Sequence, residues 1–147
     1  MIEESLVTFD SSPGLANLVG ATILVDSNDY KGVHHASRAL AGDFGRVTKS
    51  DPNPLQIIDE SQANCLKIRG LNAIIVGSID SSWPIKKLKN AGKIDVSSIR
   101  GKWESFSTAV VENPLPGCEK ALVIAGSDKR GAIFGAYTLS NQIGVSP

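Results

Sequence analysis

The chain has 147 residues, close to the commonest size of a single domain and long enough for one hydrophobic core. Hydrophobic residues make up 41% of it and charged residues 20%, as in an ordinary globular protein. Its 15 basic and 15 acidic side chains cancel, which argues against nucleic acid or an anionic membrane as a partner. No apolar run reaches the roughly 18 residues of a membrane-spanning helix, and no secretory signal is visible at the N-terminus. We therefore expect one soluble domain.

The first half of the chain alternates short apolar runs with one amphipathic pattern. Apolar runs at Leu6–Phe9 and Thr22–Val25 predict two strands that pair closely, separated by the turn-forming residues 11–14. The segment Asp26–Asp29 then offers N-cap residues for a helix that ends near Lys49. Apolar residues three and four positions apart predict its buried face, which comprises Val33, Ala36, Leu40, Phe44 and Val47.

Two further apolar runs, at Leu55–Ile58 and Ala73–Val76, predict strands. The second is continuous rather than alternating, which is typical of a strand that helices cover on both faces. Pro84 suits the first turn of a helix, and the apolar residues Ile85, Leu88 and, more weakly, Ile94 predict its buried side.

The last third of the chain predicts two strands, Phe106–Val111 and Ala121–Ala125, followed by a helix over Lys129–Ile143. The connection between these strands is too short for a parallel crossover, so we expect an antiparallel pair. Gly131 and Gly135 predict close approach of another backbone to the helix, whose buried face comprises Ala132, Ala136, Leu139 and Ile143. The fold class is therefore α/β, a single domain whose mixed, partly antiparallel sheet has helices packed on it.

Acidic residues follow most of the predicted strands. In open α/β sheets the carboxyl ends of strands line the ligand crevice, so a cluster there would be a candidate catalytic site. Aspartate is also a common cap and turn residue, which is the interpretation we favour. The residues concerned are Asp10, Asp26, Asp59, Asp80 and Asp128.

The histidines and cysteines predict neither a metal site nor a catalytic pair. His34 and His35 are adjacent, so on a helix they point about 100° apart and are expected at the surface or its boundary. Cys65 and Cys118 are interpreted as two isolated thiols, with one long-range disulfide as the alternative. We expect no cofactor.

The stretch Ala121–Gly135 runs from a buried strand through a glycine turn into a helix, as a phosphate-binding loop does. Ala132 and Ile133, however, stand where such a loop needs a lysine and a serine or threonine. The three closely spaced glycines of a dinucleotide site are absent as well, so the stretch predicts no nucleotide site.

The run Lys120–Pro147 strongly resembles the junction between the N-terminal domain and the catalytic barrel of glycoside hydrolase family 115, the xylan α-1,2-glucuronidases. Lys93–Glu104 with the following Asn113–Gly117, and more loosely Asp43–Thr48, resemble other parts of that N-terminal domain. The sequence departs from the family pattern at Lys49, Phe134 and Thr138.

The resemblance implies that residues 1–147 form the accessory α/β domain that precedes a (β/α)₈ barrel beginning just after Pro147. The complete enzyme would remove (4-O-methyl-)glucuronic acid side chains from xylan, outside the cell. Its catalytic carboxylates would lie in the barrel, so no catalytic residue is assigned to this chain, and its partners would be that barrel and the uronic acid substrate. The alternative is a free-standing α/β module that binds a small ligand or carbohydrate.

Against carbohydrate binding, only 5% of the residues are aromatic, and burial is the expected fate of both Trp83 and Trp103. The rings of Phe134 and Tyr137 widen the apolar stripe of the last helix, so we expect the domain to cover them only partly. In the complete enzyme that excess would pack on the barrel.

Lys129 and Arg130 lie in the first turn of the last helix, where the helix dipole disfavours cations. The favoured explanation is that Arg130 pairs with Asp128 or with a barrel carboxylate, or reaches solvent. The sharper hypothesis is a substrate site of Asp128, Lys129 and Arg130, in which the arginine binds the uronate carboxylate.

Overall fold

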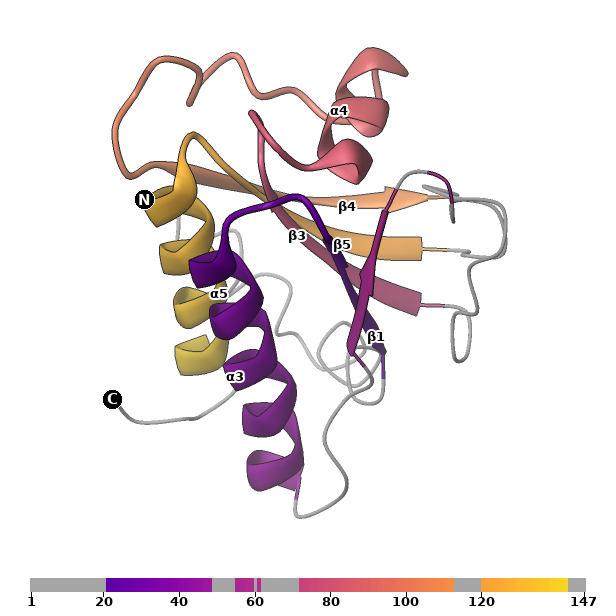
Figure 1. The fold of residues 1–147 in the computed structure, drawn as a ribbon, viewed down its shortest axis with the longest axis vertical. Coiled ribbons are helices and arrows are strands. Elements are labelled where there is room, and N and C mark those ends of the chain that lie inside the picture. Colours follow the sequence, from indigo (N-terminus) through magenta and orange to yellow (C-terminus); the bar gives the residue numbers. More distant parts are fainter. Residues whose placement is uncertain (1–20, 49–54, 60, 62–71, 113–119, 143–147) are drawn as a thin grey trace.

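A computed structural model of the chain describes residues 21–48, 55–59, 61, 72–112 and 120–142 (Figure 1). The predicted strand at Leu6–Phe9, and therefore its pairing, lies outside these residues, as do Asp10, Cys65 and Cys118. All the other predicted strands and helices are present. In chain order the elements are β1 (Thr22–Asp26), α3 (Lys31–Thr48), β2 (Leu55–Ile58), β3 (Asn72–Ser78), α4 (Trp83–Asn90), β4 (Phe106–Glu112), β5 (Lys120–Gly126) and α5 (Lys129–Gln142).

The strands form one five-stranded sheet in the order β2-β1-β3-β5-β4. β1 is parallel to β2 and β3, and β3 is parallel to β5. β4 is antiparallel to β5, with Phe106 opposite Gly126 and Glu112 opposite Lys120. The predicted mixed sheet and its antiparallel pair are therefore confirmed, and β4 closes one edge.

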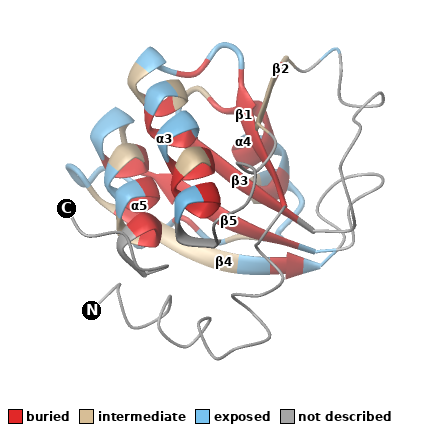
Figure 2. Cartoon of the chain, turned by 90° about the horizontal axis from the view of Figure 1, so that it is seen from below, coloured by how far each residue is buried: buried red, intermediate tan, exposed pale blue. Residues whose placement is uncertain are grey.

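Helices cover the sheet on both faces, as the continuous apolar run of β3 predicts. Alternate residues of that strand serve different cores: Ile74 and Val76 lie in the core under α3 and α5, whereas Ile75 lies in the core under α4. Figure 1 shows α3 and α5 side by side on one face and α4 on the other. Figure 2 shows the buried residues of α3 and α5 turned toward the strands. Each central strand is thus shielded from water on both sides.

The helix α4 begins as predicted but is shorter. Ser82 is its N-cap, its hydroxyl accepts a hydrogen bond from the backbone N–H of Ile85 at 3.5 Å, and Pro84 lies in the first turn. The chain leaves the helix through Gly92, whose φ is 75°. Ile94 therefore lies beyond the helix, although its half-buried side chain packs against the same core. None of the helices among the described residues is long and apolar enough to cross a membrane.

α5 lies very close to the loop before β4, and glycine makes this possible. A Cβ at Gly131 would lie 2.0 Å from the carbonyl oxygen of Ser105, so the predicted approach of another backbone is confirmed there. At Gly135 the prediction is wrong, because the neighbours are side chains: a Cβ would lie 2.3 Å from Cγ2 of Ile124. Both glycines bring the helix down onto β4 and β5.

We predict that Gly131→Ala destabilises the domain by about 1–3 kcal/mol, because the added methyl group must displace backbone rather than a flexible side chain. The matched control is Gly42→Ala within α3, where the nearest atom to a Cβ is the end of the Arg46 side chain at 3.6 Å. That substitution should stabilise the domain by about 0.5–1 kcal/mol, since alanine is the better helix former. Urea unfolding of both variants measures the difference, and equal effects would contradict the packing described here.

Candidate functional site

The predicted strand-end aspartates do share one edge of the sheet, but they do not converge on a common site. Asp26 is the last residue of β1, Asp59, Asp80 and Asp128 follow β2, β3 and β5, and these parallel strands end at the same edge. Asp59 Oδ1 accepts a hydrogen bond from Ser61 N at 3.0 Å, and Asp80 is exposed. In the described part of the chain, no three His, Cys, Asp or Glu side chains lie close enough to hold a metal ion.

The crevice between β1 and β3 is where the strand order reverses, the usual ligand position in an open α/β sheet. Here the buried carboxylate of Asp26 occupies it. Its Oδ2 accepts a hydrogen bond from Trp83 N at 2.7 Å and its Oδ1 accepts one from Asn28 N at 2.9 Å. A depression of about 340 Å³ remains beside it, lined by Asp26, Asn28, Ser81, Trp83 and Lys86. Because both carboxylate oxygens already bind backbone, Asp26 ties β1 to α4.

Asp29 makes the matching connection from the same loop to β3. Its Oδ2 accepts a hydrogen bond from Ser78 N at 3.0 Å, and its Oδ1 accepts one from Ser78 Oγ at 2.9 Å. α3 begins only after Tyr30, whose carbonyl oxygen accepts from His34 N. The predicted helix cap between Asp26 and Asp29 is therefore wrong, because both carboxylates reach across the sheet edge instead.

Burial raises the pKa of Asp29 above its ordinary value of 3.8, and the negative charge of Asp26 adds to this. The hydrogen bonds from Ser78 and Tyr30 oppose the rise but do not cancel it. Removing the carboxylate from water therefore outweighs the hydrogen bonds that the ionised form accepts.

The two histidines lie where the sequence predicts. His34 is half-buried, with Nε2 at 2.7 Å from the backbone oxygen of Asp26, and His35 is exposed.

At the N-terminus of α5, Asp128 is the capping residue. Its Oδ1 accepts a hydrogen bond from Gly131 N at 2.8 Å, and its Oδ2 accepts one from Glu104 N at 3.1 Å. A carboxylate therefore occupies the place where a phosphate-binding loop would hold its anion. It also provides the negative charge that the helix dipole favours, in a turn that otherwise carries Lys129 and Arg130.

Each of the two cations has a partner that the sequence does not predict. Arg130 Nη1 donates to Glu104 Oε1 at 3.1 Å, so the predicted pairing with Asp128 is wrong. Lys129 Nζ lies 5.8 Å from the ring centroid of Tyr30. The Arg130 side chain is 69% exposed and that of Glu104 39%, so this ion pair contributes little to stability. No sequence pattern links Arg130 to Glu104, because only the folded loop brings them together.

The two tryptophans differ in their exposure to solvent. Trp83 is buried as predicted, and its Nε1 donates to the carbonyl oxygen of Ile58 at 3.4 Å. Trp103 is 86% exposed, so the prediction of burial is wrong for this residue. It lies on the loop that follows α4. Val96 and Ile99, which precede it on this loop, belong to the core under α4.

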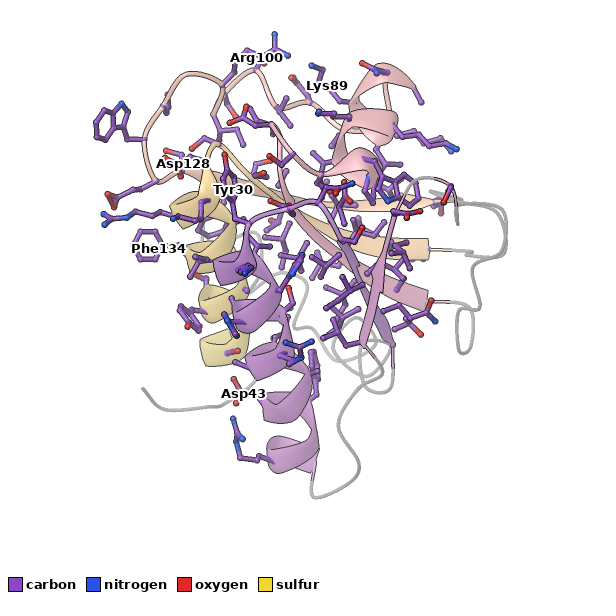
Figure 3. The ribbon with its side chains drawn as sticks, in the orientation of Figure 1. Tyr30, Asp43, Lys89, Arg100, Asp128 and Phe134 are labelled. Atoms are coloured by element: carbon purple, nitrogen blue, oxygen red, sulfur yellow. The ribbon has the colours of Figure 1, made fainter. Side chains whose placement is uncertain are left out.

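Trp103 lines two depressions. One has a volume of about 430 Å³ and is lined by Tyr30, Trp103, Glu104, Asp128, Lys129 and Arg130. The other has a volume of about 450 Å³ and includes Lys89, Arg100 and Lys102 in its lining. Figure 3 shows Tyr30 and Asp128 near the start of α5, and Lys89 and Arg100 above the sheet on the α4 side. The three predicted substrate residues thus lie together, at one end of the molecule.

The outer face of α5 carries two aromatic rings that the domain covers only partly. Phe134 is 45% exposed and Tyr137 is 49% exposed, which confirms the prediction for both rings. Figure 3 shows Phe134 pointing away from the sheet.

These features define an α/β domain whose sheet-edge carboxylates Asp26, Asp29 and Asp128 hold backbone groups of the domain itself. The chain matches no protein-family model and no curated protein. Among solved structures it is similar to a family GH115 4-O-methyl-α-glucuronidase with specificity for decorated arabinogalactans. The match has 29% sequence identity and a TM-score of 0.60, and it covers 86% of this chain and 14% of that enzyme's chain. The resemblance to glycoside hydrolase family 115 is confirmed, and the chain is similar to a domain of a glycoside hydrolase.

We predict a pH-dependent stability difference between the wild-type chain and Asp29→Asn. The raised pKa means that the folded protein favours protonated Asp29, so the wild type is most stable relative to the variant below the ordinary value of 3.8. It loses this relative stability as the pH rises through the raised pKa. Urea unfolding at a series of pH values measures the trend.

The matched control is Asp95→Asn. Asp95 is exposed, and a hydrogen bond from Ser97 N lowers the pKa of its carboxyl. The wild type should therefore lose stability relative to this variant as the pH falls, the opposite trend. The same trend in both variants would contradict the assignment.

Proposed function

We propose that the chain is the N-terminal, supporting domain of a glycosidase that removes (4-O-methyl-)glucuronic acid side chains from a plant polysaccharide. The similarity over 86% of the chain to a 4-O-methyl-α-glucuronidase is the observation that carries this proposal. The resemblance of the run Lys120–Pro147 points to xylan as the polymer. The specificity of the structural neighbour makes a decorated arabinogalactan the second candidate. By the same resemblance, we propose that the enzyme works outside the cell.

The proposed role is support rather than catalysis. Hydrolysis of a glycosidic bond uses two carboxyl groups that face each other across the sugar, about 5–10 Å apart. In the described residues, Asp26, Asp29 and Asp128 each accept hydrogen bonds from backbone N–H groups on two sides. A carboxylate committed in this way cannot also act freely as an acid or a nucleophile, which supports a catalytic centre in another domain.

The proposed partner is a catalytic barrel, and the outer face of α5 is its contact surface. Phe134 and Tyr137 expose apolar area that the domain itself does not cover. Burying both rings against a second domain would remove that area from water.

We predict that the purified chain releases no uronic acid from either polymer. A chimera in which this chain replaces the matching segment of the 4-O-methyl-α-glucuronidase should, in contrast, remain active. Introducing Phe134→Ser and Tyr137→Ser into the chimera should lower its melting temperature by several degrees, because the contact with the barrel loses apolar area. Uronic acid release and thermal unfolding measure the two effects.

Two outcomes would contradict the proposal. One is turnover by the purified chain that a single Asp or Glu substitution abolishes. The other is a folded chimera without activity.

We further propose that Arg130 binds the uronate carboxylate of the substrate, with Lys129 beside it and Asp128 holding the turn in place. The ion pair with Glu104 is exposed to water and therefore weak, so a substrate carboxylate can replace it.

We predict that Arg130→Ala in the chimera lowers kcat/KM by about one to two orders of magnitude, since a hydrogen bond to a charged group is worth about 1.5–3 kcal/mol. Glu104→Gln is the matched control: it removes the same ion pair but keeps Arg130, so activity should change little. If kcat/KM falls equally in both variants, the ion pair between Arg130 and Glu104 has a structural role. Unchanged kcat/KM in Arg130→Ala would exclude the substrate role.

A further inference from the structure

We propose that Trp103 is a stacking platform for a uronic-acid-bearing oligosaccharide, and that the cations around it bind the sugar carboxylate. The chain itself therefore carries a binding site for the polymer. The proposal rests on the proposed function for the class of ligand, but not for the existence of the site.

The exposure of Trp103 is the first observation. At 86% it is far more exposed than any other large apolar residue in the described residues, the next being Tyr137 at 49%. A tryptophan turned to water loses the large free-energy gain that burial of its ring would give. A flat apolar ring that stands free can instead cover the apolar C–H face of a pyranose.

The second observation is that hydrogen bonds hold the backbone of the loop that carries Trp103. Glu104 adopts a φ of 53°, an unfavourable conformation for a residue with a side chain, and its N–H is bound by Asp128. Ser105 and Ser127 exchange two hydrogen bonds, from Ser127 N to Ser105 O at 2.7 Å and from Ser105 N to Ser127 Oγ at 3.0 Å. Ser105 Oγ also donates to the carbonyl oxygen of Trp103 at 3.1 Å. The ring is thus presented by a loop whose backbone is tied to the start of α5, so little backbone entropy of this loop remains to be lost on binding.

The third observation is the charge around the ring. Five cations line the two depressions beside Trp103: Lys89, Arg100, Lys102, Lys129 and Arg130. The same depressions contain three carboxylates, of Asp80, Glu104 and Asp128. The five cations outnumber the three carboxylates, so the surroundings of the ring carry an excess of positive charge that favours an anion. The whole chain has no net charge, and this concentration of cations is therefore local.

A flat ring with nearby cations also suits single-stranded nucleic acid, whose bases stack on aromatic side chains. The glycan is favoured because the chain as a whole lacks the excess positive charge with which proteins follow a phosphate backbone. The depressions of about 430 and 450 Å³ also suit one or two sugar rings better than an extended strand.

The test is titration of the 147-residue chain, by tryptophan fluorescence and calorimetry, with three probes. They are a xylo-oligosaccharide with one 4-O-methylglucuronic acid, the same oligosaccharide without it, and a short single-stranded oligothymidylate. We expect the acidic oligosaccharide to bind about tenfold or more tightly than the neutral one, with an affinity that falls as salt is added. Trp103→Ala should weaken binding by at least about tenfold, and Arg130→Gln with Lys129→Gln should remove the preference for the acid.

The controls are Tyr137→Ala, an exposed ring outside both depressions, and Lys87→Gln, an exposed cation outside both depressions. Neither should change the affinity. Three results would overturn the proposal: no binding of the acidic oligosaccharide, equal losses in Tyr137→Ala and Trp103→Ala, or tight binding of the oligothymidylate alone. If the chimera is active but the chain does not bind the acidic oligosaccharide, this inference is contradicted and the proposed function stands. If the chain binds the acidic oligosaccharide but the chimera is inactive, the proposed function is contradicted and this inference stands.

Discussion

The central strands β1, β3 and β5 carry apolar side chains on both faces, and water has to be excluded from both. One face is closed by α3 and α5, which pack side by side. The other is closed by α4 together with Val96 and Ile99 from the loop that follows it. The tight packing of α5 and the route of residues 91–105 both serve this requirement. The positions of the polar side chains follow in turn, because the loops that carry them are fixed where they cross the sheet edge.

At that edge the aspartates act as connectors between elements. Asp26 joins β1 to α4, Asp29 joins the same loop to β3, and Asp128 joins the start of α5 to the loop before β4. Burying the carboxylates of Asp26 and Asp29 costs free energy, and here both accept hydrogen bonds from backbone N–H groups, whereas Asp128 is only half-buried. An open α/β sheet usually binds its ligand at this crevice. In this domain the chain's own carboxylates fill the crevice between β1 and β3, which is consistent with a supporting role.

The proposed binding and contact surfaces lie at the start of α5 and along its outer side. Two features of different chemistry lie there: a cationic rim around Trp103, and the partly exposed rings of Phe134 and Tyr137. A polar, charged rim suits a small anionic ligand, whereas apolar rings on a helix suit contact with another protein surface. Both features include residues of α5, so a change in the packing of this helix would affect them together.

The sequence by itself determined the elements of the fold described here and their burial, because hydrophobic periodicity and turn residues are local signals. The continuous apolar run of β3 identified a strand covered on both faces, and the short connection between β4 and β5 determined that they are antiparallel. The sequence also placed Asp128, Lys129 and Arg130 in one turn, since they are adjacent. The tertiary structure alone decided their partners. Glu104 is 26 residues from Arg130, and the loop that brings it there follows no periodic pattern. The exposure of Trp103 was decided in the same way: residues of α4 with Val96 and Ile99 form the core on that face of the sheet, and the loop carries the ring outside it.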